Sequence, residues 1–172
     1  MLVHFETHAT SRDNEAGLAS GHFDVDLSTQ GVRQAADLAA RYAEGTLTMV
    51  YSSDLKRAWR TAEIAFAGSP ILLVRDARLR ECDYGAWTRR PAAEIDAMRL
   101  RFNDEPFPQG ESYGQVVTRM EAFLKDTVPS GDMLLIGHRA TWYALEHLLA
   151  GRGLEEIIRG PWQWQPGWIY RM

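Results

Sequence analysis

The stretch MLLIG at residues 133–137 is the strongest fold signal in the chain, because it is an unbroken apolar run of strand length. Apolar residues at every position, rather than at alternate positions, are typical of a strand that is buried on both faces. His138 follows the run directly, and a helical pattern covers residues 140–150. A buried strand that leads straight into a helix indicates a parallel sheet covered by helices.

The same alternation of strands and helices extends along the rest of the chain. Short apolar or β-branched runs predict strands at residues 2–7, 48–51 and 71–74. Helical spacing predicts helices at residues 28–44, 54–67, 92–102 and 113–125. The tryptophan-rich tail at residues 160–172 contains Pro161 and Pro166, which favour an edge strand or a covering loop.

The first two helices have clear boundaries and apolar faces. Ser28 is a good N-cap for the first helix, and Gly45 and Gly68 are good stop signals for the two helices. The residues expected to face inward are Leu27, Val32, Ala35, Leu38 and Ala39 in the first helix and Leu55, Ala58, Ala62 and Ile64 in the second.

The chain as a whole has the size and composition of one globular domain. It has 172 residues, of which 45% are hydrophobic and 24% are charged. Strands that alternate with helices build parallel sheets with helices on both faces. We therefore expect a single domain over residues 1–172, folded as a three-layer α/β/α sandwich with a mostly parallel central sheet.

Composition also limits the partners and the location of the chain. The net charge of −4 argues against a nucleic-acid partner, which usually demands a basic stripe. The single cysteine, Cys82, excludes a disulfide framework and a cysteine-rich zinc site. The first residues lack a signal-peptide pattern, and no apolar run approaches the ~20 residues that span a bilayer. We expect a cytoplasmic protein without a membrane partner, and the sequence leaves the oligomeric state open.

Polar side chains follow three of the predicted strands. His8 comes after the first strand, and His138 follows the MLLIG strand. After the second strand come two serines at 52–53 and, one helical turn later, Arg57. Ligands of parallel sheets bind beyond the carboxyl ends of the strands. We therefore expect two imidazoles and one guanidinium to meet at one edge of the sheet.

These three groups suit phosphoryl transfer. A neutral imidazole that is oriented through its other nitrogen is a good nucleophile, and His8 is the candidate. A transferring phosphoryl group needs fixed donors around its oxygens, which Arg57 and His138 can supply. The leaving oxygen needs a proton, and Glu81, in the loop after the third strand, is the best candidate for the acid.

Several sequence blocks resemble those of the histidine phosphatase superfamily, whose members include phosphoglycerate mutase-like enzymes. The blocks occur in the family order and cover nearly the whole chain. The similar blocks are Thr7-His8-Ala9, then Asn14, Gly21, DVDLSTQGVRQA at 24–35, SDLKRAWRTA at 53–62, LRE at 79–81 with Gly85 and Trp87, PQGES at 108–112 and IGH at 136–138.

The resemblance implies a phosphoglycerate mutase-like fold and hydrolysis of a phosphomonoester of a small molecule. It implies that His8 is phosphorylated, that Arg57 and His138 bind the phosphoryl oxygens, and that Glu81 is the general acid and base. It also implies that Asn14 helps to bind phosphate, with Ser11 and Gly21 beside it. No metal and no cofactor is implied.

The chain departs from the family pattern beside the nucleophile. The family motif is Arg-His-Gly, whereas this chain has Thr7 and Ala9 on either side of His8. Loss of one charge-assisted hydrogen bond costs about 1.5–3 kcal/mol, or about one to two decades of rate. Arg12 or Arg139 could supply the missing charge, and we take Arg139 as a candidate substrate-binding residue.

Three alternatives remain open at this level. A mutase of the same family is one, although the short chain offers little sequence for a lid that would retain the intermediate. A catalytically weak relative that binds a phosphorylated ligand is the second, motivated by Thr7. A metal site of His4, Glu6 and His8 on one strand face is the third. A motif frame centred on His4 is rejected, because it places bulky Phe5 where the backbone must approach phosphate.

Other side chains could line the pocket. The basic candidates are Arg12, His22, Arg89, Arg90 and Arg139, and the aromatic ones are Tyr84, Trp87 and Trp142. Trp162, Trp164 and Trp168 are expected to cover the edge of the core rather than to contact a ligand.

Overall fold

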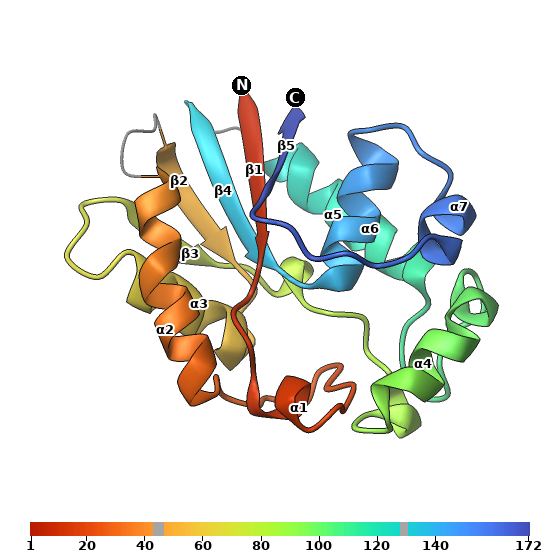
Figure 1. The fold of residues 1–172 in the computed structure, drawn as a ribbon. Helices are drawn as coiled ribbons and strands as arrows, with labels where there is room; N and C mark the ends of the chain where they lie inside the picture. Colours follow the sequence, from red (N-terminus) through yellow and green to blue (C-terminus); the bar gives the residue numbers. More distant parts are fainter. Residues whose placement is uncertain (43–46, 128–130) are drawn as a thin grey trace.

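The computed structural model describes residues 1–42, 47–127 and 131–172, which form a five-stranded sheet between two layers of helices (Figure 1). The strands are β1 (Leu2–Thr7), β2 (Leu47–Ser52), β3 (Leu72–Arg75), β4 (Asp132–Gly137) and β5 (Trp168–Arg171). The helices are α1 (Arg12–Glu15), α2 (Thr29–Leu38), α3 (Lys56–Ala65), α4 (Ala92–Met98), α5 (Tyr113–Asp126), α6 (Arg139–Leu148) and α7 (Leu154–Arg159).

The sheet is mostly parallel, as the sequence predicts. Its strand order is β3-β2-β4-β1-β5, and the pairs β3/β2, β2/β4 and β4/β1 are parallel. The last strand, β5, pairs antiparallel with β1 at the edge, which confirms the edge strand expected in the tail. The register pairs Thr7 with Gly137, so the residues that follow β1 and β4 are neighbours at the same end of the sheet.

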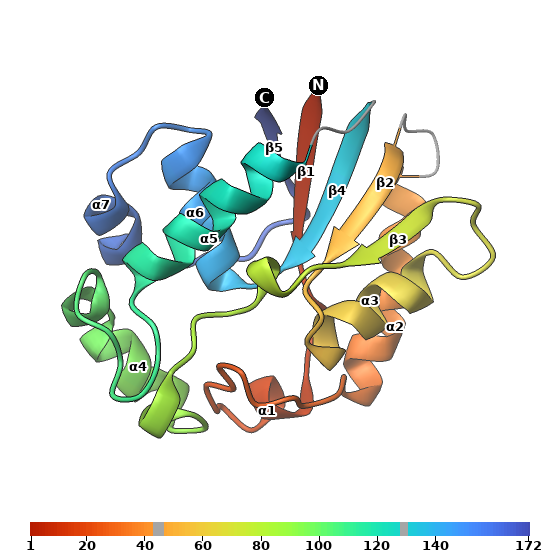
Figure 2. The same cartoon turned by 180° about the vertical axis from the view of Figure 1, so that it is seen from behind.

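The central strand β4 is buried on both faces, which explains its unbroken apolar run. Met133 and Leu135 pack into the core shared with α5 and α6, whereas Leu134 and Ile136 pack into the core shared with α3. Figure 2 shows the same arrangement from behind, with α5 and α6 on one side of the sheet and α2 and α3 on the other. The three-layer α/β/α sandwich is therefore confirmed.

The first predicted helix is shorter than expected, and one of its inward residues was wrong. Ser28 caps α2 by accepting a hydrogen bond from the backbone N–H of Gly31, but Val32 is 40% exposed. Ala35 and Leu38 are buried as expected, and the third buried position of the helix is Gly31. A Cβ on Gly31 would lie 2.0 Å from the carbonyl oxygen of Thr10, so this close approach decides which face turns inward. Glu44 and Gly45 lie outside the described residues.

Other element boundaries differ by small amounts. The helix predicted at 92–102 divides into α4 and a 3-10 turn, Arg99–Phe102. The helix predicted at 54–67 starts at Lys56 and ends at Ala65. Two helices, α1 and α7, were not predicted, because they have only four and six residues and show no clear periodicity. In the described part of the chain, no helix has the length and apolarity needed to cross a bilayer.

Candidate active site

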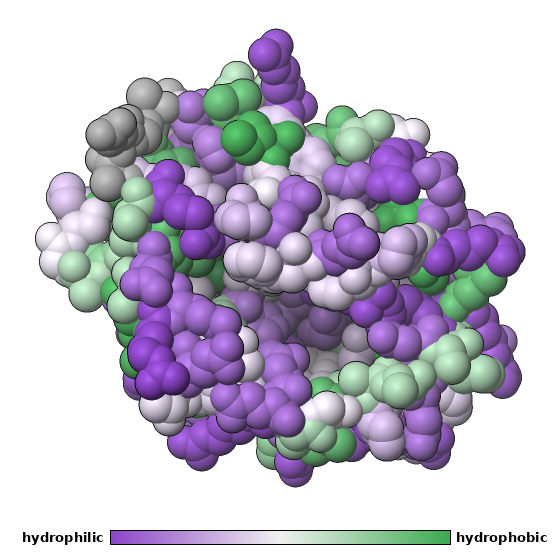
Figure 3. All heavy atoms as spheres, in the orientation of Figure 1, coloured by the Kyte–Doolittle hydropathy of each residue, from purple (hydrophilic) through white to green (hydrophobic). Residues whose placement is uncertain are grey.

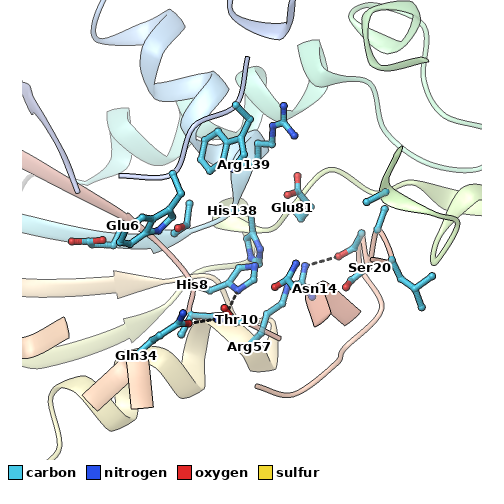
Figure 4. Close-up of a pocket in the computed structure, with 18 of the residues that line it drawn as sticks. Glu6, His8, Thr10, Asn14, Ser20, Gln34, Arg57, Glu81, His138 and Arg139 are labelled. Atoms are coloured by element: carbon cyan, nitrogen blue, oxygen red, sulfur yellow. Dashed lines mark hydrogen bonds between the residues drawn. The ribbon is translucent and has the colours of Figure 1, made fainter. Parts of the chain in front are cut away.

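A pocket of about 650 Å³ opens at the carboxyl ends of β1 and β4. Figure 3 shows this face of the molecule hollowed below its centre. The four side chains that the sequence assigns to phosphoryl transfer, His8, Arg57, Glu81 and His138, all line it. Figure 4 shows the two imidazoles side by side, with Arg57 and Glu81 around them. The pocket brings together residues that come from four separate stretches of the chain.

His8 is fixed by backbone contacts directly after β1. Its backbone N–H donates to the carbonyl of Gly137 at 2.9 Å, and its Nδ1 lies 2.7 Å from the carbonyl oxygen of Ala9. A carbonyl can only accept, so Nδ1 carries the hydrogen and Nε2 keeps its lone pair. The N–H of Ala9 in turn donates to the hydroxyl of Thr61 on α3 at 3.0 Å. The orientation of the His8 ring is thereby fixed by the backbone around it.

His138 lies against His8 at the start of α6. The centroids of the two rings are 4.9 Å apart, and His138 is only 1% exposed. Its backbone N–H donates to the hydroxyl of Thr141 at 3.0 Å. Within the described residues, neither ring nitrogen of His138 has a hydrogen-bond partner. A buried imidazole without a partner is costly unless a ligand supplies one, so His138 is available to a phosphoryl oxygen.

Both imidazoles are neutral at neutral pH. Burial, followed by the positive charge of Arg57, lowers the pKa of His8 to about 3, while the bond to the Ala9 carbonyl opposes this shift. Burial and the charges of Arg57 and His8 also lower the pKa of His138 well below its ordinary value. A neutral imidazole is the form that can act as a nucleophile toward phosphorus, as the sequence predicts for His8.

These shifts predict acid destabilisation of the fold. Because the pKa of His8 falls from 6.5 to about 3 on folding, unfolding takes up a proton at any pH between these values. The free energy of unfolding should be unaffected by His8 above pH ~6.5 and should decrease by about 1.4 kcal/mol per pH unit below it, down to about pH 3. His8→Asn, which keeps a donor to the Ala9 carbonyl, should remove that slope.

Urea unfolding of both proteins between pH 4 and pH 7 measures the effect. Parallel pH dependences in the wild type and the His8→Asn variant would show that His8 is not held neutral by burial.

Arg57 supplies the fixed positive charge of the site. It lies in the first turn of α3 and is 2% exposed. Its Nη1 and Nη2 donate to the carbonyls of Phe23 and Gly21 at 3.1 and 2.8 Å. Gly21 has φ +51°, and a Cβ there would lie 3.1 Å from Tyr84, so glycine suits this turn. The guanidinium keeps further N–H groups for a ligand.

Glu81 approaches the pocket from the loop between β3 and α4. Its Oε1 accepts the backbone N–H of Cys82 at 2.8 Å and that of Ala140, in the first turn of α6, at 3.2 Å. Its backbone carbonyl accepts from His22 and Arg119 at 2.8 and 3.0 Å. One carboxylate oxygen is thus tied to the backbone, while the other is left for proton exchange with a ligand.

The residues implied by the family resemblance for phosphate binding lie near Arg57. Asn14 lines the pocket, and its Oδ1 accepts from the backbone N–H and the hydroxyl of Ser11, each at 2.9 Å. This arrangement leaves the amide N–H₂ of Asn14 as the free donor. Gly21 also lines the pocket. Ser11 does not, because it is fully buried as the N-cap of α1, so its contribution is to orient Asn14.

Some sequence candidates lie outside the pocket. Arg139 lines it, but Arg12 is exposed on α1 and does not. Arg89 bonds Asp13 at 3.2 Å, and Arg90 lies 4.0 Å from Glu94, so both are used elsewhere.

The aromatic expectations were partly wrong. Tyr84 lines the pocket, but Trp87 and Trp142 are not among its lining residues. Trp162 and Trp164 do line it, contrary to the expectation that they only cover the core edge, whereas Trp168 packs against Phe5 as expected.

Two side chains of the metal site hypothesised on β1, Glu6 and His4, have other partners in the structure. Glu6 is 1% exposed and pairs with Arg41, whose Nη2 lies 2.9 Å from its Oε2. The hydroxyl of Tyr42 donates to the same carboxylate at 2.8 Å, and His4 packs edge-on against Tyr42. Among the residues that the structure describes, no group of three His, Cys, Asp or Glu side chains could hold a metal ion. Glu6 is therefore an ion-pair partner in the pocket wall.

Several residues that line the pocket were not predicted from the sequence, and two of them, Arg99 and Asp96, form an ion pair. Arg99 is 5% exposed yet lines the pocket, and Asp96, one helical turn earlier on α4, lines it as well. Their spacing of three residues is a signal of a helical ion pair. Nothing in the local sequence indicates that Arg99 is buried in the wall of a pocket at the carboxyl ends of the strands, with Asp96 at its exposed side.

Comparisons with known proteins agree with the geometry. The family model described as histidine phosphatase superfamily (branch 1) matches residues 4–167. The chain is 36% identical over 129 residues to phosphoserine phosphatase 1 of Hydrogenobacter thermophilus, and this alignment covers 69% of this chain and 60% of that protein. It is 33% identical over 132 residues to the "probable phosphoglycerate mutase GpmB" of Proteus mirabilis, and this alignment covers 72% of this chain and 61% of that protein. The matched regions thus cover about three fifths of the length of these two relatives.

A solved structure is similar over most of the chain. The mycobacterial glucosyl-3-phosphoglycerate phosphatase in complex with VO3 superposes with a TM-score of 0.78 and 26% identity. The match covers 91% of this chain and 85% of the mycobacterial chain.

Proposed function

The chain belongs to the histidine phosphatase superfamily (branch 1), and from that membership and the pocket geometry we propose that it hydrolyses a phosphomonoester through a phosphohistidine on His8. The observation that carries the proposal is a half-buried and a buried imidazole, both neutral, beside a buried guanidinium. His8 presents a free Nε2, and His138 and Arg57 present unused donors to the same space. Such donors stabilise the charge that develops on a transferring phosphoryl group.

In the first step, Nε2 of His8 attacks phosphorus. The Nε2–P bond forms while the bond from phosphorus to the ester oxygen breaks, and Arg57, His138 and Asn14 bind the remaining phosphoryl oxygens. Glu81 acts as the general acid and donates a proton from its free oxygen to the leaving oxygen, so an alcohol departs. The Ala9 carbonyl stabilises the positive charge on the imidazole by accepting from Nδ1.

In the second step, water attacks phosphorus. Glu81, now a carboxylate, takes a proton from the water as the oxygen–phosphorus bond forms. The P–N bond breaks, inorganic phosphate leaves, and His8 returns to its neutral form. The Glu81 carboxyl ends the cycle protonated, so all atoms and charges return to the starting state.

The test is a panel of phosphomonoesters assayed in the presence of a chelator. Released inorganic phosphate and isomerised ester are measured in parallel, because the mutase alternative produces an isomer instead of phosphate. We expect phosphate release that is unaffected by the chelator. Isomer formation without phosphate, or activity that disappears with chelation, would contradict the proposal.

One observation favours a second candidate function, the binding of a phosphorylated ligand with little turnover. Thr7 lines the pocket at the position where the family motif has an arginine. The other departure is well accommodated, because Ala9 packs with Leu27 and Ala35 in a small apolar cluster. The missing guanidinium at residue 7 is therefore the feature that could limit the rate.

Substitution Thr7→Arg separates the two candidates. A restored charge-assisted bond is worth about 1.5–3 kcal/mol, so we expect kcat/KM to rise by about 10- to 100-fold. The wild type should already exceed the background of the His8→Ala variant. If the wild type equals that background and only Thr7→Arg is active, the chain is a binding protein that has lost turnover.

A further inference from the structure

We propose that Arg99 and Arg139 form a second anion-binding subsite in the pocket, which binds a carboxylate on the leaving group of the substrate. The inference rests on the proposed function, because it takes the phosphoryl group to lie at His8. It adds the class of substrate, a phosphomonoester whose alcohol carries a carboxylate.

The two guanidiniums both lie close to the ring of Tyr143. The guanidinium carbon of each arginine is 5.7 Å from the centroid of that ring. Nη1 of Arg99 also donates to the Tyr143 hydroxyl at 2.5 Å, and Arg139 lies 5.3 Å from the centroid of the Trp162 ring. Both cations line the same pocket as the two imidazoles.

The negative charge around this pair is insufficient to balance it. Arg99 and Arg139 both bond the same oxygen of Asp96, and the distance from Arg139 is 3.4 Å. Within residues 1–42, 47–127 and 131–172, Asp96 is the sole carboxylate that either guanidinium bonds. The pKa of Tyr143 is raised by burial, so its phenol stays neutral. Two positive charges and one negative charge leave one positive charge, which matches a singly charged carboxylate better than a phosphate dianion.

Both arginines also have an N–H donor that makes no hydrogen bond. The Nε of Arg99 and the Nε of Arg139 are both buried, and neither has a hydrogen-bond partner among the described residues. Arg99 is only 5% exposed, so its charge is largely shielded from water. The planar fork of a guanidinium matches the two oxygens of a carboxylate. A carboxylate would therefore meet both unused hydrogen-bonding capacity and an uncompensated charge.

This subsite is distinct from the one that binds the phosphoryl group. Arg57 is held on α3 by the carbonyls of Phe23 and Gly21, whereas Arg139 is held on α6 by Asp96 and two aromatic rings. In Figure 4 the labels of Arg57 and Arg139 lie on opposite sides of the two imidazoles. Arg139 is therefore placed to bind the leaving group rather than to replace the arginine missing at residue 7.

The test compares two esters that differ in one group, 3-phosphoglycerate and glycerol 3-phosphate, in the wild type and in Arg139→Gln. We expect the wild type to prefer the carboxylate ester. In Arg139→Gln, kcat/KM should fall about 10- to 100-fold for 3-phosphoglycerate and less than about threefold for glycerol 3-phosphate. The control Arg101→Gln removes a nearby exposed arginine, which pairs with Glu105, and should change neither value.

Two outcomes would overturn the subsite. An equal loss for both esters would place Arg139 at the phosphoryl group, and no preference in the wild type would show that no carboxylate is bound. Arg99→Lys, which keeps the charge but removes the fork, should also lower kcat/KM selectively for 3-phosphoglycerate, and an equal loss would again contradict the proposal.

A binding measurement keeps the subsite testable if no ester is hydrolysed, which would refute the proposed function alone. Calorimetry compares 4-phosphonobutyrate with butylphosphonate, which lacks the carboxylate. We expect tighter binding of 4-phosphonobutyrate by the wild type and loss of that advantage in Arg139→Gln. Equal binding of both phosphonates by the wild type would overturn the subsite independently of turnover.

Discussion

Replacement of His8 by alanine should lower kcat by about 10⁴-fold or more for every phosphomonoester that the protein hydrolyses. The substitution removes the atom that forms the bond to phosphorus, and no other described side chain offers an equivalent nitrogen. The ring centroid of His138 lies 4.9 Å from that of His8, but in the proposed mechanism His138 is a donor to the phosphoryl oxygens. The measurement is steady-state phosphate release by the purified variant.

The matched control is His4→Ala, on the same strand. His4 packs against Tyr42 and does not line the pocket, so the variant should retain kcat within about threefold. This pair of variants also distinguishes the two motif frames. Turnover by His8→Ala that equals the wild type would refute the mechanism, and loss in His4→Ala alone would favour the rejected frame.

The second large effect is expected from Glu81→Gln. A general acid and base contributes about 10²- to 10⁴-fold, so hydrolysis of alkyl phosphates should fall by that amount. The substitution is nearly isosteric, and the amide oxygen of glutamine can still accept the N–H groups of Cys82 and Ala140, so the fold should be unaffected.

An activated ester separates the two functions of Glu81, protonation of the leaving oxygen and activation of water. The leaving group of p-nitrophenyl phosphate needs no proton, so Glu81→Gln should release about one equivalent of nitrophenolate rapidly and then turn over slowly, because water is no longer activated. Asp83→Asn is the control, since Asp83 caps the N–H of Gly85 and does not line the pocket. A burst that is absent in Glu81→Gln, or present in Asp83→Asn, would contradict the assignment.

Much of the fold could be predicted because its signals are local. The apolar run at residues 133–137 is read correctly as a strand buried on both faces, since every one of its side chains faces a core. Val32 was misplaced because the inward face of α2 depends on the contact of Gly31 with the Thr10 carbonyl, which is a tertiary contact. The helices α1 and α7 are too short for a periodic pattern to be visible.

In the candidate site, too, the features with local sequence signals could be predicted, and those that depend on tertiary contacts could not. His8 and His138 could be placed together from sequence, because parallel strands put their carboxyl ends at one edge of the sheet. Glu81 could be proposed from its motif, but its bonds to two backbone N–H groups depend on the position of α6. Arg99 was missed because its significance lies in long-range contacts with Tyr143 and the pocket, and no local pattern indicates them.

The phosphoryl group on His8 is the central claim, and it can be observed directly. The protein is mixed with its best ester, stopped under alkaline conditions that preserve phosphohistidine, digested and examined by mass spectrometry. The account predicts one phosphoryl group on the peptide that contains His8, more of it in Glu81→Gln, and none in His8→Ala. Phosphate release that proceeds while the label is absent, or is carried by another residue, would contradict it.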